Sequence, residues 1–156
     1  MWIKEFTYLI TIFFLNVSAM YLAMITSPSE QTLGESIRIF YIHVPSAWLS
    51  YLSFGVSFAL TILFLYKKNF KFDFLAEDSA IIGLFYGVVA ILTGSIWAKA
   101  TWGLYWHWDP RETATLILEL AYVGYIVLRR SIVSIEKKAF VSGIYNVLSF
   151  LSLIHI

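Results

Sequence analysis

The amino-acid sequence predicts an all-α fold, a polytopic bundle of transmembrane helices. Of its 156 residues, 60% are hydrophobic and 13% are charged, and the mean hydropathy is +0.76. Soluble domains carry about 25% charged residues, so this composition indicates a membrane protein. Because isolated strands in lipid would leave their backbone polar groups unsatisfied, the spanning elements are expected to be helices.

Five apolar runs approach the length of about 20 residues that a spanning helix needs. The first three contain no charged residue, Glu119 interrupts the fourth, and the fifth is still running where the sequence ends. In the third run, Gly83 and Gly87 have the spacing of small-residue helix contacts, which predicts close helix packing. We expect one membrane domain over residues 1–156, with spans at about 6–26, 45–66, 79–98, 112–130 and 139–156.

The basic residues predict the orientation of these helices, because cytoplasmic loops carry an excess of lysine and arginine. Eight of them fall on one side of the expected spans: Lys4, Lys67, Lys68, Lys71, Arg129, Arg130, Lys137 and Lys138. Three fall on the other side: Arg38, Lys99 and Arg111. We therefore expect the N-terminus and the loops near 67–78 and 129–138 in the cytoplasm, and the loops near 27–44 and 97–112 outside.

The loop expected after the third helix is crowded with aromatic rings. Residues 97–113 read WAKATWGLYWHWDPRET and include Trp97, Trp102, Tyr105, Trp106 and Trp108. Such amphipathic rings suit a flat aromatic ligand, but they are also typical of the aromatic belt at a membrane surface. Composition alone leaves both interpretations open.

The end of this loop has the pattern of a helix start. Asp109 suits the N-cap, Pro110 the first helical position, and Glu112 the third position of a capping box. The free amides at that start, together with Arg111, predict a site for a ligand carboxylate. Gly103 permits a turn or a close ring approach earlier in the loop.

Three histidines and one acid remain as candidates for chemistry. Pro45 is expected to start the second helix, which places His43 just above it on the outer face, where it ligates iron or is a solvated interfacial histidine. His107 and His155 are weaker ligand candidates. Glu119 lies within a span and is either a functional acid or a hydrogen-bonded packing residue.

The composition also excludes some functions. The sequence has no cysteine, which rules out disulfides, thiolate metal sites and any haem held by thioether links to this chain. The net charge is +1, and no basic patch is interleaved with exposed aromatic residues, so a nucleic-acid partner is not expected.

Residues 102–111, WGLYWHWDPR, resemble the tryptophan-rich "WWD" signature of the haem-handling proteins of cytochrome c maturation. Residues 93–99, TGSIWAK, and 41–46, YIHVPS, are most similar to the haem exporter protein C (CcmC) family. This resemblance extends from the first helix into the fifth.

The resemblance implies a multi-pass protein of the cell (inner) membrane that holds haem b at its outer face and is not itself an enzyme. By analogy with the family, His43 is an axial ligand of the iron, and the haem is passed to the chaperone CcmE with the help of the ABC transporter CcmAB and the small subunit CcmD. The residues that match the haem-binding pattern are Trp102, Gly103, Tyr105, Trp106, Trp108, Asp109 and Arg111. His107 falls at a position that the signature leaves open.

The sequence departs from the family pattern at its end. The family has six spanning helices and a second axial histidine after the fifth, whereas this sequence stops before that loop, so it looks C-terminally truncated and lacks the second ligand. Two other functions remain open: a component that attaches haem covalently to cytochrome c, and a structural membrane subunit without haem.

Overall fold

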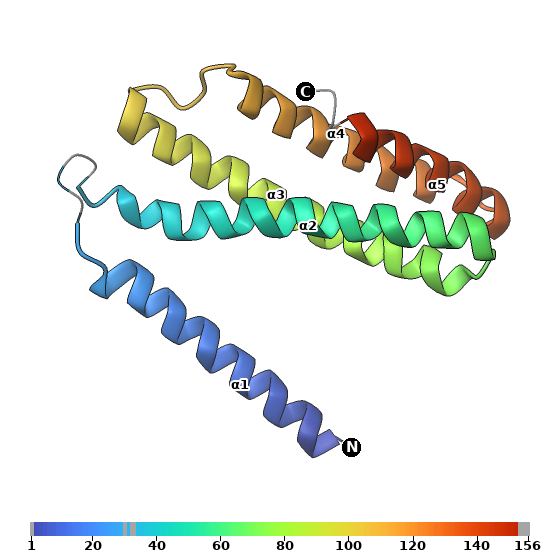
Figure 1. The fold of residues 1–156 in the computed structure, drawn as a ribbon, viewed down its shortest axis with the longest axis horizontal. Coiled ribbons are helices and arrows are strands. Elements are labelled where there is room, and N and C mark those ends of the chain that lie inside the picture. Colours follow the sequence, from blue (N-terminus) through green and yellow to red (C-terminus); the bar gives the residue numbers. More distant parts are fainter. Residues whose placement is uncertain (1, 30, 32–33, 153–156) are drawn as a thin grey trace.

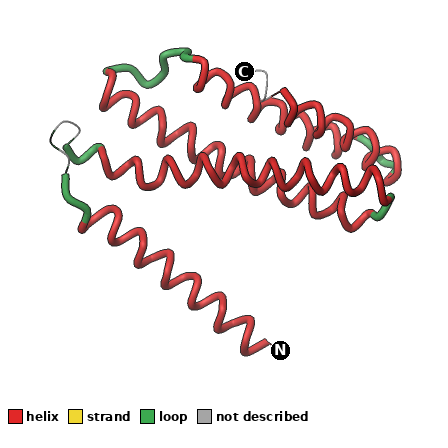
Figure 2. Tube along the Cα trace, in the orientation of Figure 1, coloured by secondary structure: helices red, strands yellow, loops and turns green. Residues whose placement is uncertain are grey.

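The computed structural model describes residues 2–29, 31 and 34–152, and of residues 2–4 the backbone alone. Within these residues the chain is helical and contains no sheet (Figures 1 and 2), which confirms the all-α prediction. The elements are α1 (Trp2–Tyr21), a single π-helical turn η1 (Leu22–Thr26), α2 (Ile37–Lys67), α3 (Phe70–Trp102), α4 (Pro110–Ser131) and α5 (Ile135–Ser152).

Three segments among the described residues are long and apolar enough to cross a membrane: Glu5–Thr26, α2 and α3. The fold class is therefore a helical membrane bundle, as predicted. Helices α4, with 22 residues, and α5, with 18, are not among these segments, and their spanning of the bilayer stays a prediction. The charged residues Glu119 and Arg129 of α4 are nevertheless buried against neighbouring helices.

Helix α2 begins eight residues earlier than the sequence pattern predicted. It starts at Ile37, and Pro45 lies inside it instead of at its start. A proline removes the hydrogen bond that its own nitrogen would donate and crowds a carbonyl of the preceding turn, and membrane helices tolerate this where neighbouring helices support the backbone. The outer loop expected at 27–44 is therefore shorter, and His43 belongs to a helix.

Helix α3 also extends beyond its predicted span at both ends. The connection to α2 consists of Lys68, in the left-handed conformation, and Asn69, whose side chain accepts a hydrogen bond from the Lys71 amide at 3.0 Å. The cytoplasmic loop predicted over 67–78 is thus mostly helix. Two of its acids, Asp73 and Glu77, form ion pairs within the bundle.

These acids bind Arg129, which was predicted to lie at a cytoplasmic loop but is 1% exposed in the last turns of α4. Its guanidinium donates to both oxygens of Asp73 at 2.7 and 2.9 Å, to Glu77 at 2.8 Å and to the Ser142 hydroxyl at 2.9 Å. This cluster connects α3, α4 and α5 at the end of the bundle opposite the aromatic loop.

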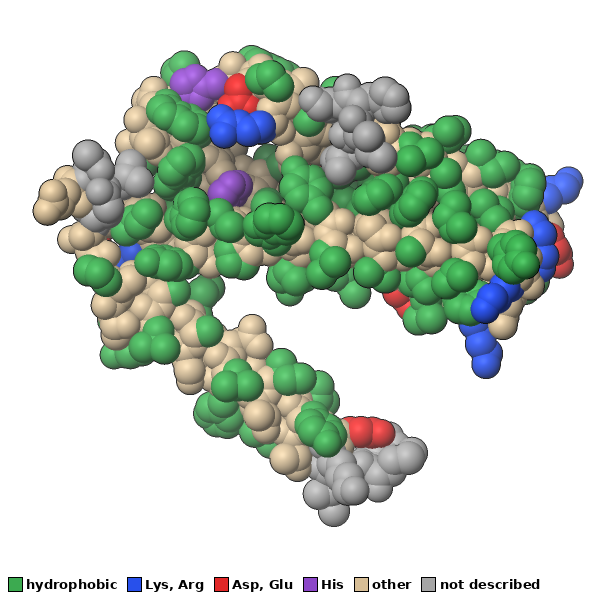
Figure 3. Space-filling view, in the orientation of Figure 1, with side chains coloured by type: hydrophobic (Ala, Val, Ile, Leu, Met, Phe, Trp, Pro, Cys, Tyr) green, Lys and Arg blue, Asp and Glu red, His purple; other side chains and the backbone are tan. Residues whose placement is uncertain are grey.

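The helix contacts consist largely of small and polar side chains. The buried face of α2 recurs every three or four residues and comprises Ser46, Ser50, Phe54, Ser57, Thr61 and Phe64. The facing side of α3 is formed mainly by alanine and glycine. Large apolar side chains cover the outside instead (green in Figure 3), as expected where lipid and not water is the solvent.

Gly83 and Gly87 confirm the predicted close packing. A Cβ at Gly83 would lie 2.5 Å from the ring of Phe54, and a Cβ at Gly87 would overlap the carboxylate of Glu119. Phe54 in turn stacks on Tyr122 of α4, with ring centroids 3.8 Å apart. The two glycines therefore let α2 and α4 place side chains directly against the backbone of α3.

Helix α1 diverges from the other four helices (Figure 1). Its described side chains are exposed, and it joins the bundle through η1, which contacts α2. Helices α2, α3 and α4, with the loop between α3 and α4, form the site described next.

Candidate functional site

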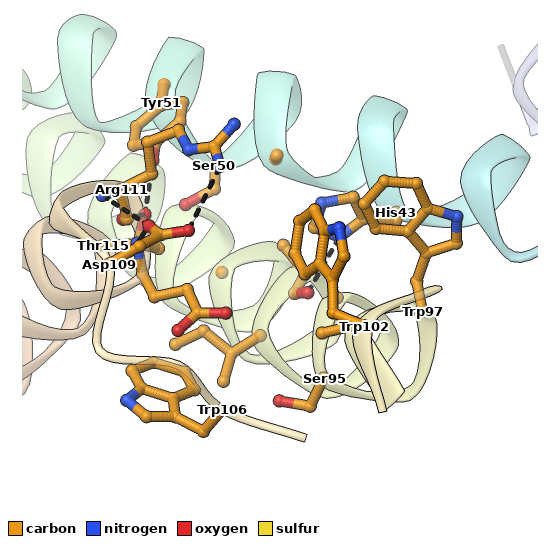
Figure 4. Close-up of a pocket in the computed structure, with 17 residues that line it drawn as sticks. His43, Ser50, Tyr51, Ser95, Trp97, Trp102, Trp106, Asp109, Arg111 and Thr115 are labelled. Atoms are coloured by element: carbon orange, nitrogen blue, oxygen red, sulfur yellow. Dashed lines mark hydrogen bonds and ion pairs between the residues drawn. The ribbon is translucent and has the colours of Figure 1, made fainter. Parts of the chain in front are cut away.

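A cavity of about 230 Å³ lies at the end of the bundle that carries the aromatic loop. Side chains from α2, α3 and the first turns of α4 line it, and the loop closes one side (Figures 3 and 4). Its walls combine aromatic rings, small residues and a few polar groups, which is the usual make-up of a small-molecule site.

His43 reaches this cavity from the second turn of α2 (Figure 4). Its Nδ1 lies 2.9 Å from the carbonyl oxygen of Ala90 in α3, with the Thr93 hydroxyl at 3.4 Å. Because a carbonyl oxygen can only accept, Nδ1 carries the proton and donates it to Ala90. The Nε2 lone pair is then free, and no described residue bonds to it.

This arrangement is the one that metal-binding histidines use. Such a histidine donates one ring N–H to a carbonyl or carboxylate, and the bond fixes both the tautomer and the orientation of the nitrogen that ligates. His43 thus has the hydrogen bonding of a metal-binding histidine, although it lies within a helix and not in the loop predicted for it.

The aromatic wall includes Trp97, a ring that was not among the residues matched to the haem-binding pattern. Trp97 and Trp102 meet edge to face, with centroids 5.3 Å apart, and Trp106 meets Trp108 in the same way at 5.6 Å. Trp97, Trp102 and Trp106 line the cavity. The indole N–H groups of Trp97 and Trp106 are buried and have no partner among the described residues.

The loop ends as its sequence predicts. Gly103 caps α3 in the left-handed conformation, and a Cβ there would meet nothing within 4 Å, so its role is the turn and not a close ring approach. Asp109 caps α4 by accepting from the amides of Arg111 and Glu112 at 2.8 and 3.0 Å. Pro110 occupies the first helical position.

Two details of the helix start differ from the prediction. The carboxylate of Glu112 accepts from the His107 amide at 2.8 Å and ties the loop to α4, instead of closing a capping box on Asp109. The Asp109 carboxylate accepts from the amides of Arg111 and Glu112, and the Asp109 backbone carbonyl accepts from the amide of Thr113. These first amides of α4 are therefore not available to a ligand. Only Arg111 remains for a ligand carboxylate.

Arg111 is well placed for that role. Its side chain is 82% exposed at the cavity rim and holds only a 3.1 Å ion pair with Asp109. The amides of Glu112 and Arg111, and the guanidinium of Arg111, hold the pKa of Asp109 below its ordinary value, so this carboxylate stays charged at neutral pH.

The structure therefore brings together His43, Trp102, Trp106, Asp109 and Arg111 around one cavity. The three other predicted site residues, Gly103, Tyr105 and Trp108, do not line it. Tyr105 lies under the Lys99 ammonium at 5.5 Å, and Trp108 is 70% exposed.

Trp97, Ala90 and Gly94 also line the cavity but were not among the residues matched to the haem-binding pattern. Trp97 and Gly94 belong to the segment TGSIWAK that carries part of the family resemblance, which was the available signal. Ala90 acts through its carbonyl group, which no sequence pattern reveals.

Glu119 and the remaining histidines lie outside the cavity lining. The Glu119 carboxylate is buried beneath the cavity, accepts from Ser50 at 3.3 Å and leaves Oε2 without a partner among the described residues. His107 is exposed and meets the edge of Trp102. His155 lies outside the described residues.

Comparison with known proteins places the chain in a family. A family model described as "Heme exporter protein C" matches residues 2–156. A putative cytochrome c biosynthesis ccmC-like mitochondrial protein of Marchantia polymorpha is 39% identical over 71% of this chain and 49% of its own length. Heme exporter protein C of Bradyrhizobium diazoefficiens is 34% identical over 81% of this chain and 48% of its own length.

Heme exporter protein C of Escherichia coli K12 is 36% identical over 65% of this chain and 42% of that protein. The chain thus spans about half the length of the curated relatives it matches. With the family model covering nearly all of it, the chain belongs to the haem exporter protein C (CcmC) family.

Proposed function

We propose that this protein binds haem b at the outer face of the membrane and delivers it for cytochrome c biogenesis. The observation that carries the proposal is His43: its Nδ1 proton is held by Ala90, and its free Nε2 belongs to a cavity walled by tryptophans. Haem would supply an iron that the free nitrogen of His43 could bind.

The residues of the cavity fit such a group. Trp97, Trp102 and Trp106 offer flat apolar area with polar edges, which suits a porphyrin disc. Arg111 at the rim suits a propionate, because a guanidinium pairs with a carboxylate through two parallel hydrogen bonds. The two indole N–H groups without partners offer further donors.

Delivery, as distinct from storage, is supported by the openness of the site. The cavity opens on the surface beside the aromatic loop (Figure 3), and its aromatic wall is only partly buried. A ligand held in this way keeps an exposed edge that a second protein can take over. By family analogy, the receiving protein is the chaperone CcmE, and the other partners are the ABC transporter CcmAB and the small subunit CcmD.

The orientation belongs to the same proposal. The aromatic loop and His43 face outward from the cell inner membrane. The opposite end of the bundle faces the cytoplasm, because it carries Lys67, Lys68, Lys71, Arg130, Lys137 and Lys138 on its helix ends and connections. The protein then acts as a haem carrier and presentation subunit and not as an enzyme.

Haem titration of the protein in detergent tests the proposal. His43→Ala should weaken haem b binding by at least about tenfold and diminish the Soret band, because the iron loses a prepared ligand. His107→Ala is the matched control and should bind like the unaltered protein, since His107 does not line the cavity. Equal affinity of the His43→Ala variant and the unaltered protein would overturn the proposal.

A further inference from the structure

Gly94 in α3 lies directly against the imidazole of His43. A Cβ at this position would lie 2.7 Å from Cε1 and 3.1 Å from Nδ1 of the ring, well inside van der Waals contact. The residue is therefore the reason that a side chain of α2 can lie against the backbone of α3 at this level.

The backbone of Gly94 gives no other reason for a glycine. It lies inside α3 with an ordinary helical conformation, where glycine lowers helix stability relative to alanine. Gly55 in α2 provides a comparison, because a Cβ there would meet Phe150 at an ordinary 3.6 Å. At Gly94, in contrast, the three atoms nearest to the position of a Cβ all belong to the His43 ring.

We propose that Gly94 is a positioning residue for His43. The absence of its Cβ lets the imidazole approach the Ala90 carbonyl, and that bond keeps the proton on Nδ1 and the lone pair on Nε2. This inference rests on the proposed function, since it assigns Gly94 a role in preparing the iron ligand.

A methyl group at position 94 should displace the ring and not the helices. His43 meets Gly94 through the end of a flexible side chain, which rotates at lower cost than packed backbone moves. The displaced ring loses the 2.9 Å bond to Ala90, so the proton is free to occupy either nitrogen. The fraction of protein with a free Nε2 lone pair then falls.

The first test needs no haem. In protein with ¹⁵N-labelled histidine, the His43 shifts should show one tautomer, protonated at Nδ1. Gly94→Ala should yield a mixture or the opposite tautomer, whereas Gly55→Ala should leave the spectrum unchanged. If Gly94→Ala retains the single Nδ1–H tautomer, the proposal is wrong.

Thermal unfolding of the haem-free protein gives a second, independent readout. Gly94→Ala should lower the melting temperature when His43 is present, because the ring must give up its hydrogen bond to Ala90 to make room for the methyl group. In a His43→Ala background the same substitution should raise the melting temperature, because only the gain in helix propensity remains. An equal change in both backgrounds would mean that Gly94 does not act on His43.

Haem b titration separates this inference from the proposed function. Gly94→Ala should weaken binding by about tenfold, and it should have no further effect once His43 is alanine. If His43→Ala weakens binding but Gly94→Ala does not, the haem function stands and the positioning role falls. If His43→Ala has no effect either, the proposed function falls. The tautomer and unfolding measurements then still decide whether Gly94 positions the His43 ring.

Discussion

At the scale of single residues, Asp109 stabilises the junction on which the aromatic loop depends. It satisfies two amides of α4 and orients the side chain of Arg111. The loop is held a second time by Glu112, through the His107 amide. The loop that carries Trp106 is therefore fixed to the start of α4 by hydrogen bonds between residues two to five positions apart.

The charge of Asp109 should make this junction sensitive to acid. Its pKa is lowered in the folded protein, so its stabilisation is complete above the ordinary aspartate value of 3.8 and is lost as the pH falls through the lowered pKa. The melting temperature of the unaltered protein should exceed that of Asp109→Asn at neutral pH, and the difference should vanish in strong acid. A difference independent of pH would show that the charge contributes nothing.

The contacts of a residue could be predicted from the sequence only where its partners lie close to it along the chain. The cap at Asp109 and the turn at Gly103 were predictable, because their partners lie within a few positions. The contact of His43 with Ala90 and Gly94 joins residues 47 and 51 positions apart and depends on the register of α2 against α3. No local pattern contains that register.

At the scale of helices, the cluster around Arg129 holds α3, α4 and α5 together, as Asp109 holds the aromatic loop to α4. The sequence suggested a positively charged loop, and the structure buries the arginine with two acids instead. The start of α2 was mispredicted for a related reason, because Pro45 is tolerated where helix packing outweighs a local signal. The hydrophobic runs predicted the existence of the helices, but not their ends.

Removing Arg129 should destabilise the bundle. Arg129→Met leaves Asp73 buried without its cation, which typically costs about 3–5 kcal/mol. Arg130→Met is the matched control, because Arg130 is exposed at the adjacent position. Unfolding of the detergent-solubilised protein should show the loss for Arg129→Met alone. Replacing Asp73 by leucine as well should recover part of it, and failure of both effects would contradict the assigned role.

At the scale of the whole molecule, the proposed orientation can be tested directly because the chain contains no cysteine. Leu104 in the aromatic loop and Val133 between α4 and α5 are 57% and 98% exposed. In intact spheroplasts, an impermeant maleimide should label Leu104→Cys but not Val133→Cys, and permeabilisation should expose both. The opposite pattern would reverse the proposed orientation.

The length of α2 fixes the depth of the site, whichever side it faces. From Lys67 to His43 the helix rises about 36 Å, whereas the hydrocarbon layer is about 30 Å thick. If α2 stands upright with Lys67 at one boundary, His43 lies just beyond the other, at the level of the lipid headgroups. A molecule with a flat apolar body and charged edges settles at that depth by itself, so the bilayer concentrates such a ligand at the level of the cavity before any protein contact forms.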